Sequence, residues 1–415
     1  MPGKSIVDIK QQIRRYAVLN LIRQRSPLSR GELARITGIQ VPTVVNLIGV
    51  LKREGFVIED GYSHSTAGRR SALLAINRRG KRVVGVELTG QSIRAVVTDL
   101  EGTVYGRGFL HTDPRNLWQL STDLRTVISE SVAQAGHSMG TISGIGIGIP
   151  GRIDRKGGTG TVQIDGDELT LPVVSIVEQE FHVPVTVEHD IDTAAIGEGW
   201  FTGNQDHGSL VYVSLGERIR SATMIDGRVY RSGVEDLEGP GHIVIDRNGP
   251  PCYCGSDGCL EVYASTGAIT ADIIAGINRT ISLQGRGVRS PIRDLTGDDL
   301  GKIDIDTVIQ AAQMGDIVAF NRLDQAGRQI GTVFADVVKL LRPDSIVLNG
   351  SLTRAGEGFL GTIRREIRGR VAFGWNPDAQ LRLARGKDDA VAIGGAALAI
   401  RELFHVDEIR NVICV

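Results

Sequence analysis

Residues 29–55 have the sequence SRGELARITGIQVPTVVNLIGVLKREG, and this stretch decides the fold of the N-terminal part of the chain. Ser29 and Glu32 have the spacing of a capping box, in which each side chain bonds the backbone N–H of the other at the start of a helix. Gly38 ends that short helix, Pro42 stands in the first turn of the next, and Gly55 is its expected C-cap. Two helices separated by a glycine-containing turn predict a helix-turn-helix.

The flanking residues predict a winged version of this motif. Apolar residues recur at three- and four-residue steps through residues 9–25, as in an amphipathic helix, and Pro27 ends the pattern. Residues 56–61 are typical of a strand that enters a turn, and residues 71–77 of its partner strand. We therefore expect a winged helix-turn-helix domain, with its linker, in residues 1–82.

The charge of the chain is divided unevenly. Residues 1–82 contain 16 Lys and Arg but 5 Asp and Glu, a net charge of +11, whereas the remainder carries −12. A basic head on an acidic body favours binding of double-stranded DNA by the head. Two other interpretations stay open: a helical module that docks on another protein and, for the charge alone, a solvated charged face.

The recognition helix supplies the candidates for base contacts. Its N-terminal part points at base edges, which indicates direct readout by Gln40, Thr43 and Asn46. The interleaved valines are Val41, Val44 and Val45. One of them could touch a thymine methyl group, while the others would pack in the domain core.

Basic residues supply the candidates for backbone contacts. We expect Arg30 and Lys52 to bind phosphate groups. Arg69 and Arg70 follow Gly68 after the expected wing. They either enter a narrow A·T minor groove or belong to a solvated linker.

The rest of the chain contains two similar series of strands and helices. Strands are expected at residues 83–88, 93–99, 103–106 and 142–149, with a helix at 117–135. A second series begins with strands at 210–215, 221–225 and 228–230. The repetition predicts two α/β halves with a cleft for a small ligand.

A cluster of metal-ligand residues lies in the second half. Gly241-His242 is followed by PCYCGSDGCLE at residues 251–261, so that His242, Cys252, Cys254 and Cys259 can form a closed tetrahedral shell for structural zinc. Gly255 and Gly258 would allow the tight loop. The alternative is a loop with three reduced cysteines, and Cys414 is expected to be a free thiol.

These motifs together resemble the ROK family (repressors, open reading frames, kinases), in its repressor branch. The resemblance rests on IGIGIPG at 145–151, EHDID at 188–192, the His/Cys cluster, DSIVLNG at 344–350 and GGAA at 394–397. It implies an α/β, two-lobed, actin-like body of the hexokinase (ribonuclease H-like) type, a sugar or sugar-phosphate effector in the cleft, and a homodimer or a tetramer. The expected lobes are residues 83–193, completed by 389–415, and residues 194–388 with the zinc loop and the dimer interface.

Two positions bear on kinase activity. Sugar kinases of this family have Asp-x-Gly-Gly-Thr in the phosphate-binding turn, where this chain has Glu87-Leu88-Thr89-Gly90-Gln91. Asp190 occupies the place of the catalytic base, but His189 replaces the preceding Asn, as in the family's repressors. We expect no enzyme activity, and Asp190 to accept a hydrogen bond from a sugar hydroxyl, to cap the following helix, or both.

The resemblance also implies sugar contacts around the zinc loop. Glu261 and His242 would bond the sugar, His242 with the ring nitrogen that does not face zinc. His189, beside Asp190, is also an expected sugar contact. The family's usual Glu-x-Gly-His has Gly239 at its Glu position here, and Glu238 lies one residue earlier. Glu238 either reaches the sugar through a rearranged loop or the contact is lost.

The sequence thus predicts a sugar-responsive repressor that binds operator DNA as a dimer. The alternatives are a ROK-type sugar kinase and a repressor controlled by a protein, such as a sugar-transport component. The chain of 415 residues has 53 glycines without a collagen period, no apolar run of about 20 residues and no secretory signal. We therefore expect two or three domains and a cytoplasmic location.

Overall fold

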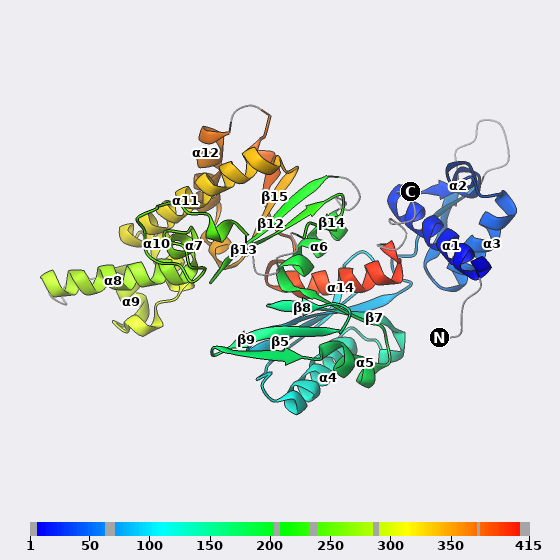
Figure 1. Ribbon diagram of the computed structural model, residues 1–415, viewed down its shortest axis with the longest axis horizontal. Helices are drawn as coiled ribbons and strands as arrows, with labels where there is room; N and C mark the ends of the chain where they lie inside the picture. Colours follow the sequence, from blue (N-terminus) through cyan, green and yellow to red (C-terminus); the bar gives the residue numbers. More distant parts are fainter. Residues whose placement is uncertain are drawn as a thin grey trace. The chain divides into compact units, whose positions relative to one another are not determined.

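The computed structural model describes residues 6–62, 71–202, 208–231, 239–284, 290–371 and 374–406 (Figure 1). The chain forms two compact units, Met1–Gly197 with Val391–Val415, and Glu198–Ala390. Among the described residues no single helix is long and apolar enough to cross a membrane, although the bent pair Arg30–Thr37 and Val41–Arg53 passes that test when taken together. Arg69, Arg70, Glu238 and Cys414 lie outside the described residues.

The first unit begins with a winged helix, as the sequence predicts. It contains α1 (Ile6–Arg25), β1 (Leu28–Ser29), α2 (Arg30–Thr37), α3 (Val41–Arg53), β2 (Val57–Tyr62) and β3 (Ala72–Ile76). The three strands form a sheet in the order β1-β3-β2.

The caps of the two short helices confirm the local prediction. The Ser29 side chain accepts a hydrogen bond from the Glu32 N–H, and the Glu32 carboxylate accepts one from the Ser29 N–H. Gly38 is left-handed (φ 68°) directly after α2. Gly55 (φ 81°) lies one residue beyond the cap residue Glu54, and the N–H groups of Gly55 and Phe56 close a Schellman motif on the carbonyls of Lys52 and Leu51.

A five-stranded sheet forms the centre of the first unit. Its order is β11-β7-β4-β5-β6, from β4 (Arg82–Leu88), β5 (Ser92–Thr98), β6 (Val104–His111), β7 (Ile142–Ile149) and β11 (Val185–His189). Strand β6 is longer than the expected 103–106. Its inward positions include Gly106 and Gly108, which face α4 (Leu117–Gln134) in place of apolar side chains and so hide the strand period.

Isoleucine and glycine alternate along β7, so that the two faces of the sheet carry different residues at this strand. Ile145, Ile147 and Ile149 pack in the core with α4 and α5 (Val173–Phe181). Gly146 instead faces α14 (Ala390–Leu403), and a Cβ atom there would lie 2.0 Å from the carbonyl oxygen of Gly395. Gly85, its partner in the register of β4 and β7, is as close to the backbone of Ala392. The small residues therefore allow α14 to lie directly on the sheet.

Three further short strands and one helix follow β7. Strands β8 (Arg152–Asp154), β9 (Thr159–Ile164) and β10 (Asp167–Leu171) form a separate sheet in the order β10-β9-β8, which the sequence analysis did not predict. Short β11 then leads directly into α6 (Asp190–Thr202), which crosses from the first unit to the second between Gly197 and Glu198.

The second unit repeats the sheet topology of the first. Its sheet has the order β14-β13-β12-β15-β16, from β12 (Ser209–Leu215), β13 (Ile219–Ile225), β14 (Arg228–Val229), β15 (Ser345–Asn349) and β16 (Leu381–Leu383). In both sheets the first strand pairs antiparallel with the second and parallel with the fourth. The predicted two α/β halves are thus confirmed.

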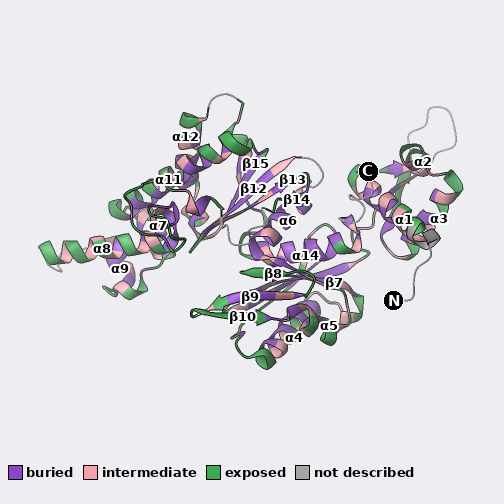
Figure 2. Ribbon diagram, in the orientation of Figure 1, coloured by how far each residue is buried: buried purple, intermediate pink, exposed green. Residues whose placement is uncertain are grey.

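Helices make up most of the remaining described residues of the second unit. The α-helices are α7 (Glu261–Ala264), α8 (Thr266–Gln284), α9 (Pro291–Thr296), α10 (Ile305–Gln313), α11 (Ile317–Leu341), α12 (Glu357–Arg370) and α13 (Pro377–Gln380). The inner face of α11 supplies Ile330, Phe334 and Val338 to the core that covers the sheet. Figure 2 shows this pattern, with buried residues on β12 and β15 and exposed residues along the outer sides of α8 and α12.

The residues that follow α14 contact the winged helix within the first unit. The Asn20 side chain on α1 donates a hydrogen bond of 2.8 Å to the carbonyl oxygen of Phe404. The Phe404 ring packs edge-on against Phe56, with ring centres 5.7 Å apart, and the ring of Tyr16 lies 4.0 Å from that of His405. Two segments almost a full chain apart are therefore held together by a buried contact.

Candidate functional site

The four residues predicted to bind metal converge in the second unit. The ligand atoms of His242, Cys252, Cys254 and Cys259 all lie within 4.8 Å of one another. Cys252 Sγ is 3.5 Å from His242 Nδ1, and Cys254 Sγ is 3.6 Å from Cys259 Sγ. Tetrahedral zinc with ordinary bond lengths would place a sulfur–nitrogen pair about 3.6 Å apart and two sulfurs about 3.8 Å apart. The cluster therefore has the donor set and the spacing for a tetrahedral metal ion.

Two glycines give the loop its shape. Gly255 and Gly258 have φ angles of 91° and 66°, which favour glycine. A Cβ atom on Gly258 would also lie 1.6 Å from the carbonyl oxygen of Asp246, so this position admits no side chain. Isolated bridges join Val244 to Cys259 and Pro251 to Asp257, which brings the two ends of the loop together.

The second and third cysteines of the loop differ in the acidity of their thiols. The backbone N–H of Ser256 lowers the pKa of Cys254 to about 7, whereas burial raises the pKa of Cys259 to about 12. A buried thiol of this kind loses its proton at neutral pH when a metal cation takes the proton's place. The cluster is thus suited to binding a cation, whereas three thiolates held this close together without one would repel each other.

Neighbouring groups orient His242 and also Glu261, which follows Cys259 by two residues. The second ring nitrogen of His242 is 3.0 Å from the Tyr253 hydroxyl, a partner that the sequence analysis missed. The Arg218 guanidinium lies over the Tyr253 ring at 4.8 Å. The carboxylate of Glu261 is buried and accepts a hydrogen bond of 2.7 Å from the N–H of Ile219 on β13. Gly241, next to His242, packs against the same carboxylate.

The other two expected sugar residues lie in the first unit, at the end of β11 and the start of α6. Asp190 is buried, and one carboxylate oxygen accepts a hydrogen bond of 2.7 Å from the N–H of Ile191 and lies 3.6 Å from His189 Nδ1. Neighbouring Glu188 is also buried and forms an ion pair with Arg155. The motif EHDID thus places three consecutive polar side chains where β11 meets α6.

The turn at the kinase phosphate position is closed by its own side chain. Thr89 Oγ1 accepts hydrogen bonds from the N–H groups of Gln91 (3.2 Å) and Ser92 (3.0 Å). The Thr89 N–H in turn donates to the carbonyl of Ser92. Backbone donors that a phosphate-binding turn presents to its ligand are here used within the turn.

The recognition helix α3 presents its expected base-contacting side chains with different exposure. Gln40 and Asn46 are exposed, and Thr43 is half-buried. Val44 is completely buried, whereas Val41 and Val45 are 50% and 45% exposed. Of the three valines, Val44 thus belongs to the domain core, and the other two lie on the surface.

The two expected phosphate-binding residues share one acidic partner. Glu59 on β2 accepts hydrogen bonds through the same carboxylate oxygen from Arg30 (2.6 Å) and Lys52 (2.8 Å). These bonds lower the pKa of the Glu59 carboxyl group, the bond from Lys52 most. The three side chains are all about one-third exposed and form one surface network.

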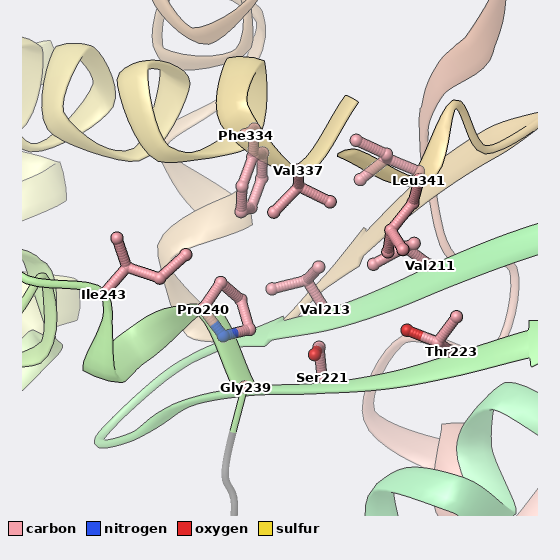
Figure 3. A pocket seen from close by; sticks show the side chains of 11 residues that line it. Val211, Val213, Ser221, Thr223, Gly239, Pro240, Ile243, Phe334, Val337 and Leu341 are labelled. Carbon is pink, nitrogen blue, oxygen red and sulfur yellow. The ribbon is translucent and has the colours of Figure 1, made fainter. Parts of the chain in front are cut away.

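The second unit also contains an apolar cavity of about 200 Å³. Figure 3 shows Phe334 and Val337 of α11 on one side, and Val213 and Pro240 on the other. The residues predicted to bind sugar are absent from its lining within the described part of the chain. Because its walls offer few hydrogen-bond partners, this cavity is poorly suited to a sugar.

Comparisons with known proteins give one consistent family. Residues 83–402 match the sequence profile of the ROK family. The xylose repressor of Caldicellulosiruptor bescii is 29% identical over 402 residues, covering 96% of this chain and 98% of the relative.

Solved structures agree on the fold. A ROK family transcriptional regulator, a homologue of the Escherichia coli MLC protein, matches with a TM-score of 0.77 and 23% identity over 96% of this chain and 97% of its own. A ROK family glucokinase from Streptomyces griseus, in complex with glucose and AMPPNP, matches with a TM-score of 0.63 and 28% identity. It covers 77% of this chain and 99% of its own.

Proposed function

Because the chain belongs to the ROK family, we propose that it is a sugar-responsive transcriptional repressor that binds operator DNA through its winged helix. The extent of the matches carries the proposal. The match to the xylose repressor covers 96% of this chain. The match to the glucokinase covers 99% of the glucokinase but 77% of this chain. The share of this chain that the repressor matches and the glucokinase does not is about as long as the winged helix, which is the N-terminal domain of this chain.

We assign the DNA contacts to polar and basic residues of this domain and its linker. Gln40, Thr43 and Asn46 would contact base edges, and Arg30, Lys52 and the two arginines at 69 and 70 would contact the DNA backbone or the minor groove. A pair of winged helices reads a pseudo-palindromic site, so we propose that the repressor binds as a homodimer or a dimer of dimers.

Asp190 is the central residue of the proposed effector site. Its carboxylate is buried, and an ionised acceptor of this kind contributes about 1.5–3 kcal/mol to the binding of a sugar hydroxyl. We also assign sugar contacts to His189, Glu238 and Glu261, and to His242 where a sugar hydroxyl replaces the Tyr253 hydroxyl as the partner of its second ring nitrogen. Effector binding would favour one arrangement of the protein over another and so change its affinity for the operator.

We further propose that the His/Cys cluster holds structural zinc through His242, Cys252, Cys254 and Cys259. Four ligands close the shell, and they leave no position for a substrate or a reactive water. The Tyr253 hydroxyl would fix the ring orientation of His242. The ion would thereby stabilise the loop that carries Glu261.

A sugar kinase is the second candidate, supported by the likeness to the glucokinase. The chemistry of the first turn argues against it. Glu87-Leu88-Thr89-Gly90-Gln91 lacks the second glycine, and the Thr89 side chain occupies the donors of Gln91 and Ser92. A turn closed in this way presents few amides to a phosphate.

Fluorescence anisotropy of a labelled duplex from upstream of the chain's own gene tests the proposal. The zinc-loaded protein is titrated at two salt concentrations, with and without hexoses, pentoses, amino sugars and their phosphates. Tight binding that one sugar relieves supports a sugar-responsive repressor. Tight binding that no sugar relieves supports control by a protein partner, and sequence-indifferent binding at both salts contradicts the repressor.

A further inference from the structure

We propose that helix α3 recognises thymine methyl groups through Val41 and Val45, and that the centre of each operator half-site is therefore composed of A·T pairs. The inference rests on the proposed function, because it names the DNA chemistry that the winged helix recognises. It is carried by the exposed face of α3 and by a glycine in the middle of that face.

The first observation is the apolar character of a surface that should be polar in an isolated domain. Val44, Leu47, Ile48 and Leu51 form the buried side of α3. Val41 and Val45 stand four residues apart along the edge of this buried side and are 50% and 45% exposed. Residues at i and i+4 are neighbours on a helix, so their methyl groups form one continuous apolar stripe.

The second observation is Gly49, the next residue of the same stripe. Glycine inside a helix costs about 1 kcal/mol relative to alanine. A Cβ atom here would meet one neighbour, the end of the Arg53 side chain at 3.8 Å, so packing within the chain does not require the glycine. A glycine that the protein itself does not need is typical of a place where a ligand approaches the backbone closely.

The third observation is the set of polar groups on this face. Helix α3 contains no charged residue before Lys52, whereas guanine is most often read by Arg or Lys. The exposed side chains beside the valines are the amides of Gln40 and Asn46, which pair with adenine. Amides for adenine and methyl groups for thymine together describe a surface complementary to A·T pairs in the major groove.

The test begins with sites selected by the full-length, zinc-loaded protein from a random duplex library. We expect half-sites with A·T pairs at the positions that α3 contacts. Each thymine of a selected site is then replaced by deoxyuridine, which removes only the methyl group. Loss of one buried methyl contact should weaken binding about fourfold, at one or two positions of each half-site.

A cycle of protein and DNA changes assigns the contact. Val45→Ala should weaken binding to the thymine duplex by about fourfold or more, yet bind the matching deoxyuridine duplex as tightly as the unchanged protein does. Val41→Ala should behave in the same way at a different thymine. Val318→Ala, a 56% exposed valine on α11 in the second unit, is the matched control and should change neither affinity.

Gly49→Ala separates a binding role from a structural one. Its methyl group should raise the melting temperature, because alanine favours the helix, and yet weaken operator binding several-fold. Equal affinity for thymine and deoxyuridine duplexes at every position, or G·C-rich selected sites, would overturn the inference and leave the repressor function standing. Failure to select any sequence would instead refute the proposed function itself.

Discussion

Phe404→Ala should release the winged helix from the rest of the first unit. The Phe404 side chain is 1% exposed and packs edge-on against Phe56, and its backbone carbonyl accepts a hydrogen bond from buried Asn20. Truncation of a buried phenylalanine typically costs about 3–5 kcal/mol. The ring contact with Phe56 joins the winged helix to the end of α14, so the free energy of their association should fall by up to that amount.

The loss of association energy is smaller than the stability of a whole domain, so local opening should be observed in place of global unfolding. A whole domain is stable by about 5–15 kcal/mol, so the sheet of the first unit should survive the substitution. We expect the winged helix to open independently and more often. A loss of about 3 kcal/mol corresponds to more than a hundredfold faster exchange of amides whose protection depends on this contact.

Native-state hydrogen exchange read by mass spectrometry measures the effect by segment. Peptides from α1 and β3 should exchange much faster in Phe404→Ala, while peptides from β4 and β7 keep their protection. Glu402→Ala is the control, since its side chain is exposed on the last turn of α14, just before Phe404. Unchanged exchange in α1, or an equal loss of protection in β4 and β7, would refute the reasoning.

Three further perturbations test other parts of the structure. Cys259→Ser, or a strong chelator, should release the proposed metal ion and lower the melting temperature of the second unit, as measured by metal content and calorimetry; a metal-free protein with unchanged melting would argue against a structural ion. Glu59→Gln should tighten DNA binding and steepen its salt dependence by about one phosphate contact, because Arg30 and Lys52 lose their shared carboxylate, with Asp60→Asn as the control; weaker binding would mean that Glu59 positions the two cations instead. Gly146→Ala should destabilise the first unit by about 3 kcal/mol in urea unfolding, because its Cβ would lie 2.0 Å from the Gly395 carbonyl, whereas Gly140→Ala, with open space around it, should have little effect; equal stability of the two variants would contradict the close packing of α14.

Local chemistry made much of the fold predictable from the sequence. The capping box at Ser29, the glycines at 38 and 55 and Pro42 each fix a helix end through the backbone, so their effect depends on few other residues. The runs at 83–88, 142–149 and 210–215 predicted strands for a different reason, since they are short and rich in valine and isoleucine, as buried strands are. The convergence of His242 and the three cysteines was also predictable, because thiols and an imidazole so close in the sequence have few other uses than metal binding.

Contacts between distant segments were not predictable. Asn20 and Phe404 are 384 residues apart, and neither lies in a motif. The partner of Arg30 and Lys52 was missed because Glu59 belongs to the wing, and only the folded sheet brings it to both cations. Strands β8 to β10 were missed because they are short, polar and rich in glycine, a composition that equally describes a loop.

The position of Glu261 explains why a metal ion would serve a repressor without a catalytic role. Its carboxylate bonds the N–H of Ile219 at the start of β13 and follows Cys259 by two residues. The residues between η2 (Gly239–His242) and α7 form isolated bridges and no regular strand, so the loop has little secondary structure of its own to fix that carboxylate. A cation held by His242 at one end and by Cys259 at the other would supply the missing constraint. Loss of the metal should therefore displace Glu261 before it disturbs the sheet, and any ligand that depends on this carboxylate should lose affinity before the protein unfolds.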